Sequence, residues 1–154
     1  MPDEVRTLPA LTKEGFEAML AESMPQVTKS GMRIDAMDHG SCRVRVSPDL
    51  HMARPGGTLS GPTMFAMADL ALYGAVLSMI GPVPLAVTSH MTINFLRKPA
   101  LKDLIAEARV LRLGKKLAYG EILLHSDGEA DPVAHATGAY AIPGHRPAPG
   151  GAGG

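Results

Sequence analysis

The alternation of apolar and polar positions predicts a mixed chain of helices and strands. Residues 12–24 place Phe16, Met19 and Leu20 on one face of a short amphipathic helix, which we expect Pro25 to end. Period-two alternation predicts six strands, at residues 31–37, 40–46, 85–96, 104–113, 117–125 and 133–142. The first two strands form a hairpin, and a loop rich in Pro and Gly at residues 48–57 follows them.

Residues 61–80 differ from these segments because they are apolar on nearly every helical face. This segment opens with Gly61-Pro62, where Pro suits a first helical turn, and stops at Gly81-Pro82. A helix without a polar face has to be buried. Because strands lie on both sides of it in the chain, we predict an α+β fold in which a curved antiparallel sheet wraps around one long central helix.

A membrane span is the alternative interpretation of residues 61–80, since a helix of this length can cross a bilayer. Asp69 lies near the middle of the segment, where a carboxylate is costly in lipid. The flanking sequence carries no basic cluster and predicts strands instead. We therefore favour the buried helix and expect no membrane association.

The chain has 154 residues, which suits one domain. We place that domain at residues 31–143, after an N-terminal segment at residues 1–30 that carries the short helix. Residues 144–154 consist of Gly, Pro, Ala, His and Arg and lack an apolar anchor, so we expect a disordered tail.

Composition narrows the possible functions. The formal net charge is zero, which argues against a nucleic-acid partner. The single cysteine, Cys42, excludes an intrachain disulfide, fits a cytoplasmic location and lies at a core position of its strand. Residues 1–11 do not read as a signal peptide. His51, His125 and His135 lack the spacing of a ligand set, so we expect no metal and no redox cofactor.

Asp69 is the one formally charged residue between residues 55 and 96, although 19% of the chain is charged. An isolated carboxylate in apolar surroundings is a candidate acid, base or nucleophile. It can equally be a structural residue that bonds to hydroxyl groups or to the backbone. Asp is a poor helix former, so helix propensity does not explain its position.

Gly61 is a candidate oxyanion donor because the first amides of a helix lack intrahelical acceptors and carry partial positive charge. Gly61 has no side chain to block the approach of a substrate. The next residue, Pro62, has no amide hydrogen and cannot be the donor. Gly61 and Asp69 are eight residues apart, or about 12 Å along a helix at ~1.5 Å per residue. One carbonyl group cannot reach both within a chain, so a shared reaction requires two subunits.

Two segments resemble hot-dog-fold thioesterases, and the phenylacetate-pathway (PaaI-like) group in particular. Residues 57–69, GTLSGPTMFAMAD, resemble the loop and helix start that carry an Ala-Asp pair in that family. Residues 92–100, TINFLRKPA, resemble its strand ending in Asn-Phe-Leu, and Gly114 precedes two basic residues as it often does there. The order of elements agrees over residues 31–142.

This resemblance implies a hot-dog fold that forms homodimers, or tetramers built as pairs of dimers, and hydrolyses acyl-CoA thioesters. It assigns Asp69 as nucleophile or general base and Gly61 as the oxyanion donor from the other subunit. No cofactor is implied beyond the CoA of the substrate.

Further residues are candidates for holding the substrate. Ser60 and Pro62 stand where the family usually has the His and the second Gly of a His-Gly-Gly triplet. Arg54 stands where the family often has an Asn or Gln near the substrate carbonyl, and Tyr73 stands where it often has a small hydroxyl residue. Asn94 lies on a polar face of its strand together with Thr88, His90 and Thr92, which borders the pocket in this interpretation. The CoA phosphates would be held by four basic residues at strand ends and turns, which are otherwise ordinary surface charges: Arg97, Lys98, Lys115 and Lys116.

Two other functions remain open. The substitutions at Ser60, Arg54 and Tyr73 also suit a protein that binds acyl-CoA or another small ligand without turnover. A hydratase of this fold would pair Asp69 with a His five residues later, where this chain has Gly74. Dehydratases place a His and an acid closer together than His51 and Asp69.

Overall fold

The computed structural model describes residues 7–48, 53–54 and 58–144. Its helices are α1 (Lys13–Ser23), α2 (Pro25–Lys29) and α3 (Gly61–Ile80). Its strands are β1 (Arg33–Asp38), β2 (Ser41–Val46), β3 (Ala53–Arg54), β4 (Thr58–Leu59), β5 (Val87–Phe95), β6 (Leu104–Leu113), β7 (Leu117–Ser126) and β8 (Ala134–Ala141). The predicted tail lies, apart from Gly144, outside the described residues.

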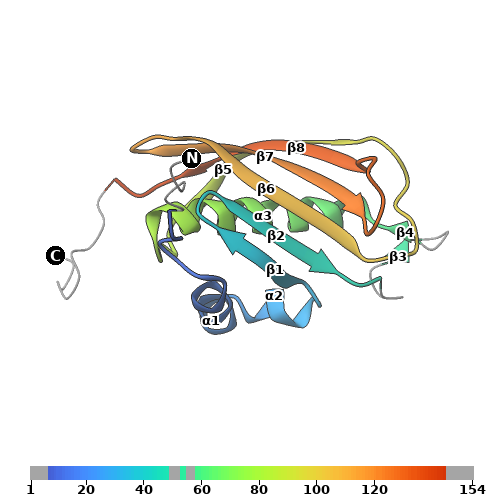
Figure 1. Cartoon of the computed structure of the whole chain (residues 1–154), viewed down its shortest axis with the longest axis horizontal. Helices are drawn as coiled ribbons and strands as arrows, with labels where there is room; N and C mark the ends of the chain where they lie inside the picture. The colour runs from blue at the N-terminus through green and yellow to red at the C-terminus, as the bar shows by residue number, and fades with distance from the viewer. Residues whose placement is uncertain (1–6, 49–52, 55–57, 145–154) are drawn as a thin grey trace, which may run out of the picture.

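Six strands form one antiparallel sheet in the order β1-β2-β6-β7-β8-β5. This sheet curves around α3, and α1 and α2 lie beside β1 (Figure 1). The hairpin predicted between the first two strands is present, with Gly40 at a φ of +87° in its turn. The predicted α+β hot-dog fold, a curved sheet around one long helix, is therefore confirmed.

Helix α3 forms where the sequence predicted it. Ser60 caps its N-terminus by accepting a hydrogen bond from the Thr63 amide at 3.3 Å, and Gly81 ends it at a φ of +87°. The helix is long and apolar enough to cross a membrane, but 67% of that apolar window is buried inside the fold. It is the core helix of the domain.

Two glycines let the sheet approach α3 closely. Gly120 of β7 and Gly138 of β8 are register partners, and both lie against the Leu72 side chain of α3. A Cβ atom added to Gly120 would lie 2.6 Å from Leu72 Cδ1. Because real Cβ atoms do not come this close, the absence of side chains here sets the spacing between helix and sheet.

The N-terminal segment differs from the prediction of a single helix. Helix α1 ends at Ser23, before Pro25, as predicted, but Pro25 then occupies the first position of a second short helix, α2, where its missing amide hydrogen costs nothing. Phe16 and Leu20 of α1 are buried in the main core, and the Ala10 amide donates a hydrogen bond to the Ser78 carbonyl of α3. The segment is thus part of the same hydrophobic core as the sheet.

Two further local predictions need correction. The predicted loop at residues 48–57 contains the short strand β3, which pairs with β4 directly before α3. Strand β5 does not keep a single polar face, because its register with β8 shifts between Thr88 and His90. Such a shift moves the following side chains to the opposite face of the sheet.

Gly74 of α3 packs against Cys42 of β2 and Phe16 of α1. A Cβ atom at this position would lie 2.6 Å from Cys42 Sγ and 2.9 Å from Phe16 Cε1. The histidine that a hydratase of this fold would carry here does not fit. This packing argues against the hydratase alternative on steric grounds.

We therefore expect Gly74→Ala to lower the free energy of unfolding, measured by urea denaturation. Overpacking costs about 1–3 kcal/mol, which exceeds the gain of up to ~1 kcal/mol that Ala has over Gly in a helix. Adding Cys42→Ala removes the sulfur atom that the new methyl group meets, so the double variant should be more stable than the sum of the two single changes. A Gly74→Ala variant more stable than the parent chain would contradict this packing argument.

Candidate active site

A pocket of ≈ 300 Å³ opens between α2 and α3, with Asp69 in its wall. One side consists of Ala66, Asp69, Leu70 and Tyr73, which lie along one stripe of α3. The remaining lining residues are Met24, Gln26, Val27, Ser30, Met32 and Tyr140. The one charged residue of the central helix thus borders a largely apolar cavity.

Two hydroxyl groups hold the carboxylate of Asp69. Thr88 Oγ1, on β5, donates to Asp69 Oδ1 at 2.5 Å, and the Tyr140 hydroxyl, on β8, donates to the same oxygen at 2.7 Å. Tyr140 also lies 3.1 Å from the Asp69 carbonyl oxygen. No described residue hydrogen-bonds to Oδ2. The carboxylate is therefore fixed through one oxygen while the other is available to a water molecule or a substrate.

Tyr140 is itself fixed by aromatic packing. Its ring stacks on Tyr73 with centroids 5.5 Å apart, and Tyr73 meets Phe16 edge to face at 5.6 Å. Burial, together with the negative charge of Asp69, raises the pKa of the Tyr140 hydroxyl well above its usual value. Tyr140 therefore remains a protonated donor to Asp69 throughout the physiological pH range.

Gly61 lies at the N-terminal end of α3, eight residues before Asp69. As the first residue of the helix its amide has no intrahelical acceptor. Its nearest side chain is Phe95 at the end of β5, whose Cζ would lie 3.2 Å from an added Cβ atom. Asp69 contacts Thr88 at the start of β5, so the two candidate catalytic groups lie near opposite ends of this strand.

The other predicted substrate residues are placed differently. The Ser60 side chain caps α3 and lies 3.0 Å from Thr63 Oγ1. The Tyr73 hydroxyl donates to the Pro84 carbonyl at 3.2 Å, so its ring lines the pocket while its hydroxyl is engaged elsewhere. Burial raises the pKa of Tyr73. Arg54 lies in β3, and its side chain falls outside the described part of the structure.

Asn94 is not brought to Asp69 within one chain. Beyond the register shift, Met91 and Ile93 pack against the core, so the alternate residues Thr92 and Asn94 face the outside of the sheet. The polar face predicted for Thr88, His90, Thr92 and Asn94 is therefore wrong for Thr88, while His90, Thr92 and Asn94 share a face that points away from the core. Only Thr88 of these four hydrogen-bonds to Asp69, because it precedes the shift.

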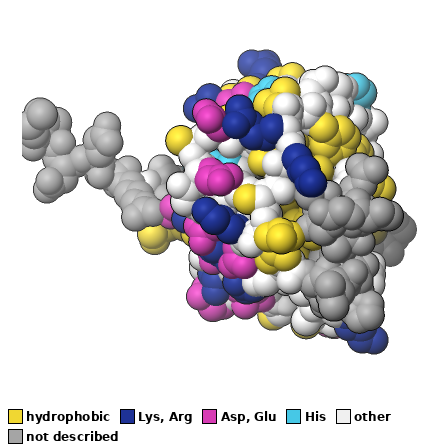
Figure 2. All heavy atoms as spheres, turned by 90° about the vertical axis from the view of Figure 1, so that its right-hand side faces the viewer, with side chains coloured by type: hydrophobic (Ala, Val, Ile, Leu, Met, Phe, Trp, Pro, Cys, Tyr) yellow, Lys and Arg dark blue, Asp and Glu magenta, His cyan; other side chains and the backbone are white. Residues whose placement is uncertain are grey.

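The four predicted CoA-binding residues fall into two pairs. Arg97 and Lys98 follow the end of β5, and Arg97 forms an exposed ion pair with Asp131 at 3.4 Å. Lys115 and Lys116 lie at the turn between β6 and β7, which is next to the opposite end of β8. Within one chain the two pairs therefore lie at opposite ends of the sheet. On the side that Figure 2 shows, which is the right-hand side of Figure 1, the described basic and acidic side chains are interleaved and form no continuous basic patch.

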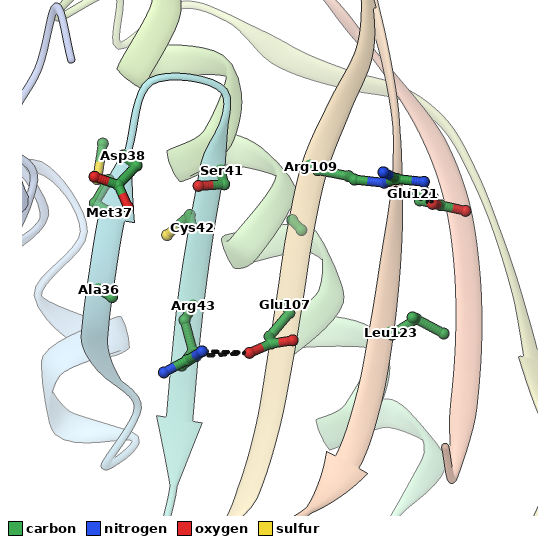
Figure 3. Close-up of a pocket in the computed structure, with 11 residues that line it drawn as sticks. Ala36, Met37, Asp38, Ser41, Cys42, Arg43, Glu107, Arg109, Glu121 and Leu123 are labelled. Atoms are coloured by element: carbon green, nitrogen blue, oxygen red, sulfur yellow. Dashed lines mark hydrogen bonds and ion pairs between the residues drawn. The ribbon is translucent and has the colours of Figure 1, made fainter. Parts of the chain in front are cut away.

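A second depression, of ≈ 320 Å³, lies over β1, β2, β6 and β7 (Figure 3). Its rim carries surface ion pairs, Arg43 with Glu107 and Arg109 with Glu121. Cys42 borders it, but burial raises the pKa of this thiol to about 12, which agrees with its predicted core role. None of the predicted site residues lines this depression.

The structure also contains site residues that the sequence did not single out. Tyr140 follows Ala134, Ala136 and Gly138 on the inner face of β8. One large polar side chain after three small buried residues was the sequence signal that could have identified it. Met24, Val27 and Met32 gave no signal, because their approach to Asp69 depends on how the N-terminal segment folds back. Within residues 7–48 and 58–144, no three His, Cys, Asp or Glu side chains are grouped as metal ligands.

Tyr140→Phe should weaken the pH dependence of stability in alkali. The raised pKa means that above pH ~10 the unfolded chain loses the phenolic proton while the folded chain keeps it. The free energy of unfolding then falls with pH by up to ~1.4 kcal/mol per pH unit from this group alone. We expect a shallower fall between pH 10 and 11 in Tyr140→Phe, measured by urea denaturation. Tyr119→Phe, at a side chain 43% exposed, is the control, and equal slopes in the two variants would contradict the assignment.

Comparison with known proteins agrees with this geometry. Residues 56–133, half of the chain, match the family model described as thioesterase superfamily. A provisionally named thioesterase from Silicibacter sp. TM1040 is 42% identical, covers 91% of this chain and 96% of its own, and superposes with a TM-score of 0.80.

Two more distant relatives are similar. The PaaI protein of the E. coli phenylacetic acid degradation operon is 25% identical over 84% of this chain and 92% of its own, with a TM-score of 0.72. A provisionally named esterase from Saccharolobus solfataricus is 29% identical over 112 residues, which is 73% of each chain. The chain belongs to the thioesterase superfamily, and its hot-dog fold and family membership support hydrolysis of acyl thioesters.

Proposed function

We propose that this protein hydrolyses acyl-CoA thioesters to a free acid and CoA in the cytoplasm, with Asp69 as the catalytic carboxylate. The observation that carries this proposal is the state of Asp69. Its Oδ1 is held by Thr88 and Tyr140, and its Oδ2 is free of described partners at an apolar pocket. A carboxylate oxygen that the fold leaves unbonded at a pocket can take a proton from a bound water or attack a bound carbonyl carbon.

Hydrolysis then needs little beyond this carboxylate and an oxyanion donor. Asp69 either accepts a proton from a water molecule that attacks the thioester carbon or attacks that carbon itself to give an anhydride, which water then opens. The carbonyl oxygen gains negative charge in both routes, and the Gly61 amide stabilises it. The C–S bond breaks, and CoA leaves as the thiolate, which takes up a proton.

A dimer formed along β5 supplies the Gly61 amide. This strand is an edge of the sheet, and Val87 and Phe95 expose 57% and 53% of their surface. An exposed apolar edge is a template for pairing with a second copy. In an antiparallel two-fold pair, the start of one β5 meets the end of the other, so Asp69 next to Thr88 approaches Gly61 of the partner subunit next to the partner's Phe95.

The same pairing would gather the basic residues. Arg97 and Lys98 follow the end of β5, which in this dimer lies beside the start of the partner's β5. The turn with Lys115 and Lys116 of the partner subunit lies at that same end of the partner's sheet. A CoA molecule bound there would have its phosphates near four positive charges. Pairing of two such dimers would give the tetramer that is the other expected assembly.

Binding without turnover is the alternative function. The observations that favour it are local: Ser60 is used as a helix cap, and the Tyr73 hydroxyl is bound to the Pro84 carbonyl. Neither side chain is therefore free to hold a substrate carbonyl or a water. Asp69 itself keeps one carboxylate oxygen without a partner among the described residues, which favours turnover.

Asp69→Asn should reduce kcat by about 10²- to 10⁴-fold, the usual loss on removal of a positioned acid or base. The amide keeps an oxygen for Thr88 and Tyr140 at nearly the same volume, so the fold should be intact. Release of CoA thiol from short, medium, long and aromatic acyl-CoAs measures the effect. Asp127→Asn, at an exposed ion pair with Arg45, is the matched control. Turnover that survives Asp69→Asn would refute the assignment of Asp69, and no turnover in the parent chain would favour the binding protein.

Gly61→Pro and Gly61→Ala separate the oxyanion donor from packing. Both place a Cβ atom against Phe95, but only Pro removes the amide hydrogen, and Pro is well accepted in a first helical turn. Ser60 already has the extended conformation, φ −76° and ψ 157°, that a following Pro requires. We expect kcat of Gly61→Pro to lie about 10²- to 10³-fold below that of Gly61→Ala.

Mixing Gly61→Pro with Asp69→Asn tests whether the two residues meet across subunits. A mixed dimer would have one intact site and one doubly defective site, so random exchange should restore about a quarter of the parent activity. If both residues act within one chain, mixing restores nothing.

A further inference from the structure

We infer that the N-terminal residues Met24, Val27 and Met32 form the outer wall of an acyl pocket and restrict the substrate to compact, uncharged acyl groups. This inference rests on the proposed function, because it names the substrate class of the same site. It concerns residues outside the segment matched by the family model, residues 56–133.

The wall is built from the connection between the N-terminal helices and β1. Met24, Val27 and Met32 are partly buried and pack against the main core, while they line the cavity that Asp69 borders. Helix α1 anchors this wall through Phe16 and Leu20, which are fully or almost fully buried. The cavity is therefore closed on one side by α3 and on the other by a segment with its own attachment to the core.

The chemistry of the lining selects against charge. Asp69 is the one charged side chain among the residues that line this cavity in the described part of the chain. The Ser30 hydroxyl is already bound to the Val27 carbonyl at 2.5 Å and accepts from the Met32 amide at 3.3 Å. A carboxylate at the far end of an acyl group would lose its water against the wall of the cavity without gaining a cation. A neutral alkyl or aryl group meets mostly apolar side chains and aromatic faces there.

The size of the pocket favours a compact acyl group. A pocket of ≈ 300 Å³ lies at the lower end of the range of small-molecule sites, so a short to medium alkyl chain or one aromatic ring fills it. Longer chains have to leave the cavity. Methionine at two of the wall positions lets the cavity accept different shapes of this size.

Val27 provides a direct test, because it lies in the wall while its neighbour Thr28 is exposed on the same short helix. We would measure kcat/KM for saturated acyl-CoAs of four to sixteen carbons with the parent chain, Val27→Phe, Val27→Ala and Thr28→Phe. In the parent chain, each added methylene should raise kcat/KM about fourfold until the pocket is full. Val27→Phe should move the optimum to chains shorter by about two carbons, and Val27→Ala to longer chains. An optimum that is the same in Val27→Phe and Thr28→Phe would overturn the inference.

The charge preference is tested with two acyl groups of equal length. Pentanoyl-CoA should be a better substrate than glutaryl-CoA by at least about tenfold, because the second carboxylate of the glutaryl group is desolvated without a partner. Equal kcat/KM values would overturn this part of the inference.

Binding of S-octyl-CoA, a thioether that cannot be hydrolysed, separates this inference from the proposed function. By calorimetry we expect Val27→Phe to weaken its binding at least about tenfold, and Thr28→Phe to leave it unchanged. If thioesters are not hydrolysed but this difference appears, the pocket assignment stands and the proposed hydrolysis fails. If thioesters are hydrolysed and the difference is missing, the hydrolysis stands and the pocket assignment fails.

Discussion

Burial of a helix that is apolar on every face is the constraint on which the rest of this structure depends. A single antiparallel sheet can cover such a helix only by curving around it, and Gly120 and Gly138 let β7 and β8 come close enough to pack on Leu72. The sheet still leaves one stripe of α3 uncovered, from Ala66 to Tyr73. Helices α1 and α2 fold back over this side, and the space that remains is the pocket. The candidate site is thus the part of the helix surface that the sheet does not reach.

The placement of Asp69 follows from the same arrangement. On this stripe a carboxylate faces a cavity instead of packed side chains, so its burial is partial and its cost is reduced. Thr88 and Tyr140, from the two strands nearest that side, satisfy one oxygen. The Tyr140 ring stacks on Tyr73, which meets Phe16 edge to face, and these contacts connect the site to α1. Rigid support on one side and free space on the other are what a catalytic carboxylate needs.

The N-terminal segment has two roles in this fold. Phe16 and Leu20 fill the core, and the short helix α2 covers the pocket, so stability and the shape of the pocket are linked through one stretch of chain. The matched family segment, residues 56–133, contains α3 and its side of the pocket, while the N-terminal wall lies outside it.

The sequence by itself determined the elements and the catalytic candidate. Period-two and all-face apolar patterns located the six main strands and α3 to within one or two residues, because these patterns reflect which faces are buried. One charge in a long neutral stretch identified Asp69. The sequence did not determine its partners: the register shift at Thr88 and His90 reverses the side chains that follow, and a count of alternating positions cannot detect it. Pro25 follows the end of α1 as predicted, but the sequence did not show that it also begins α2, because Pro is compatible with both positions. The positions of Tyr140 and Val27 at the pocket depend on contacts between distant segments, which only the tertiary structure decides. The same holds for the placement of Gly61 and Asp69 near opposite ends of β5.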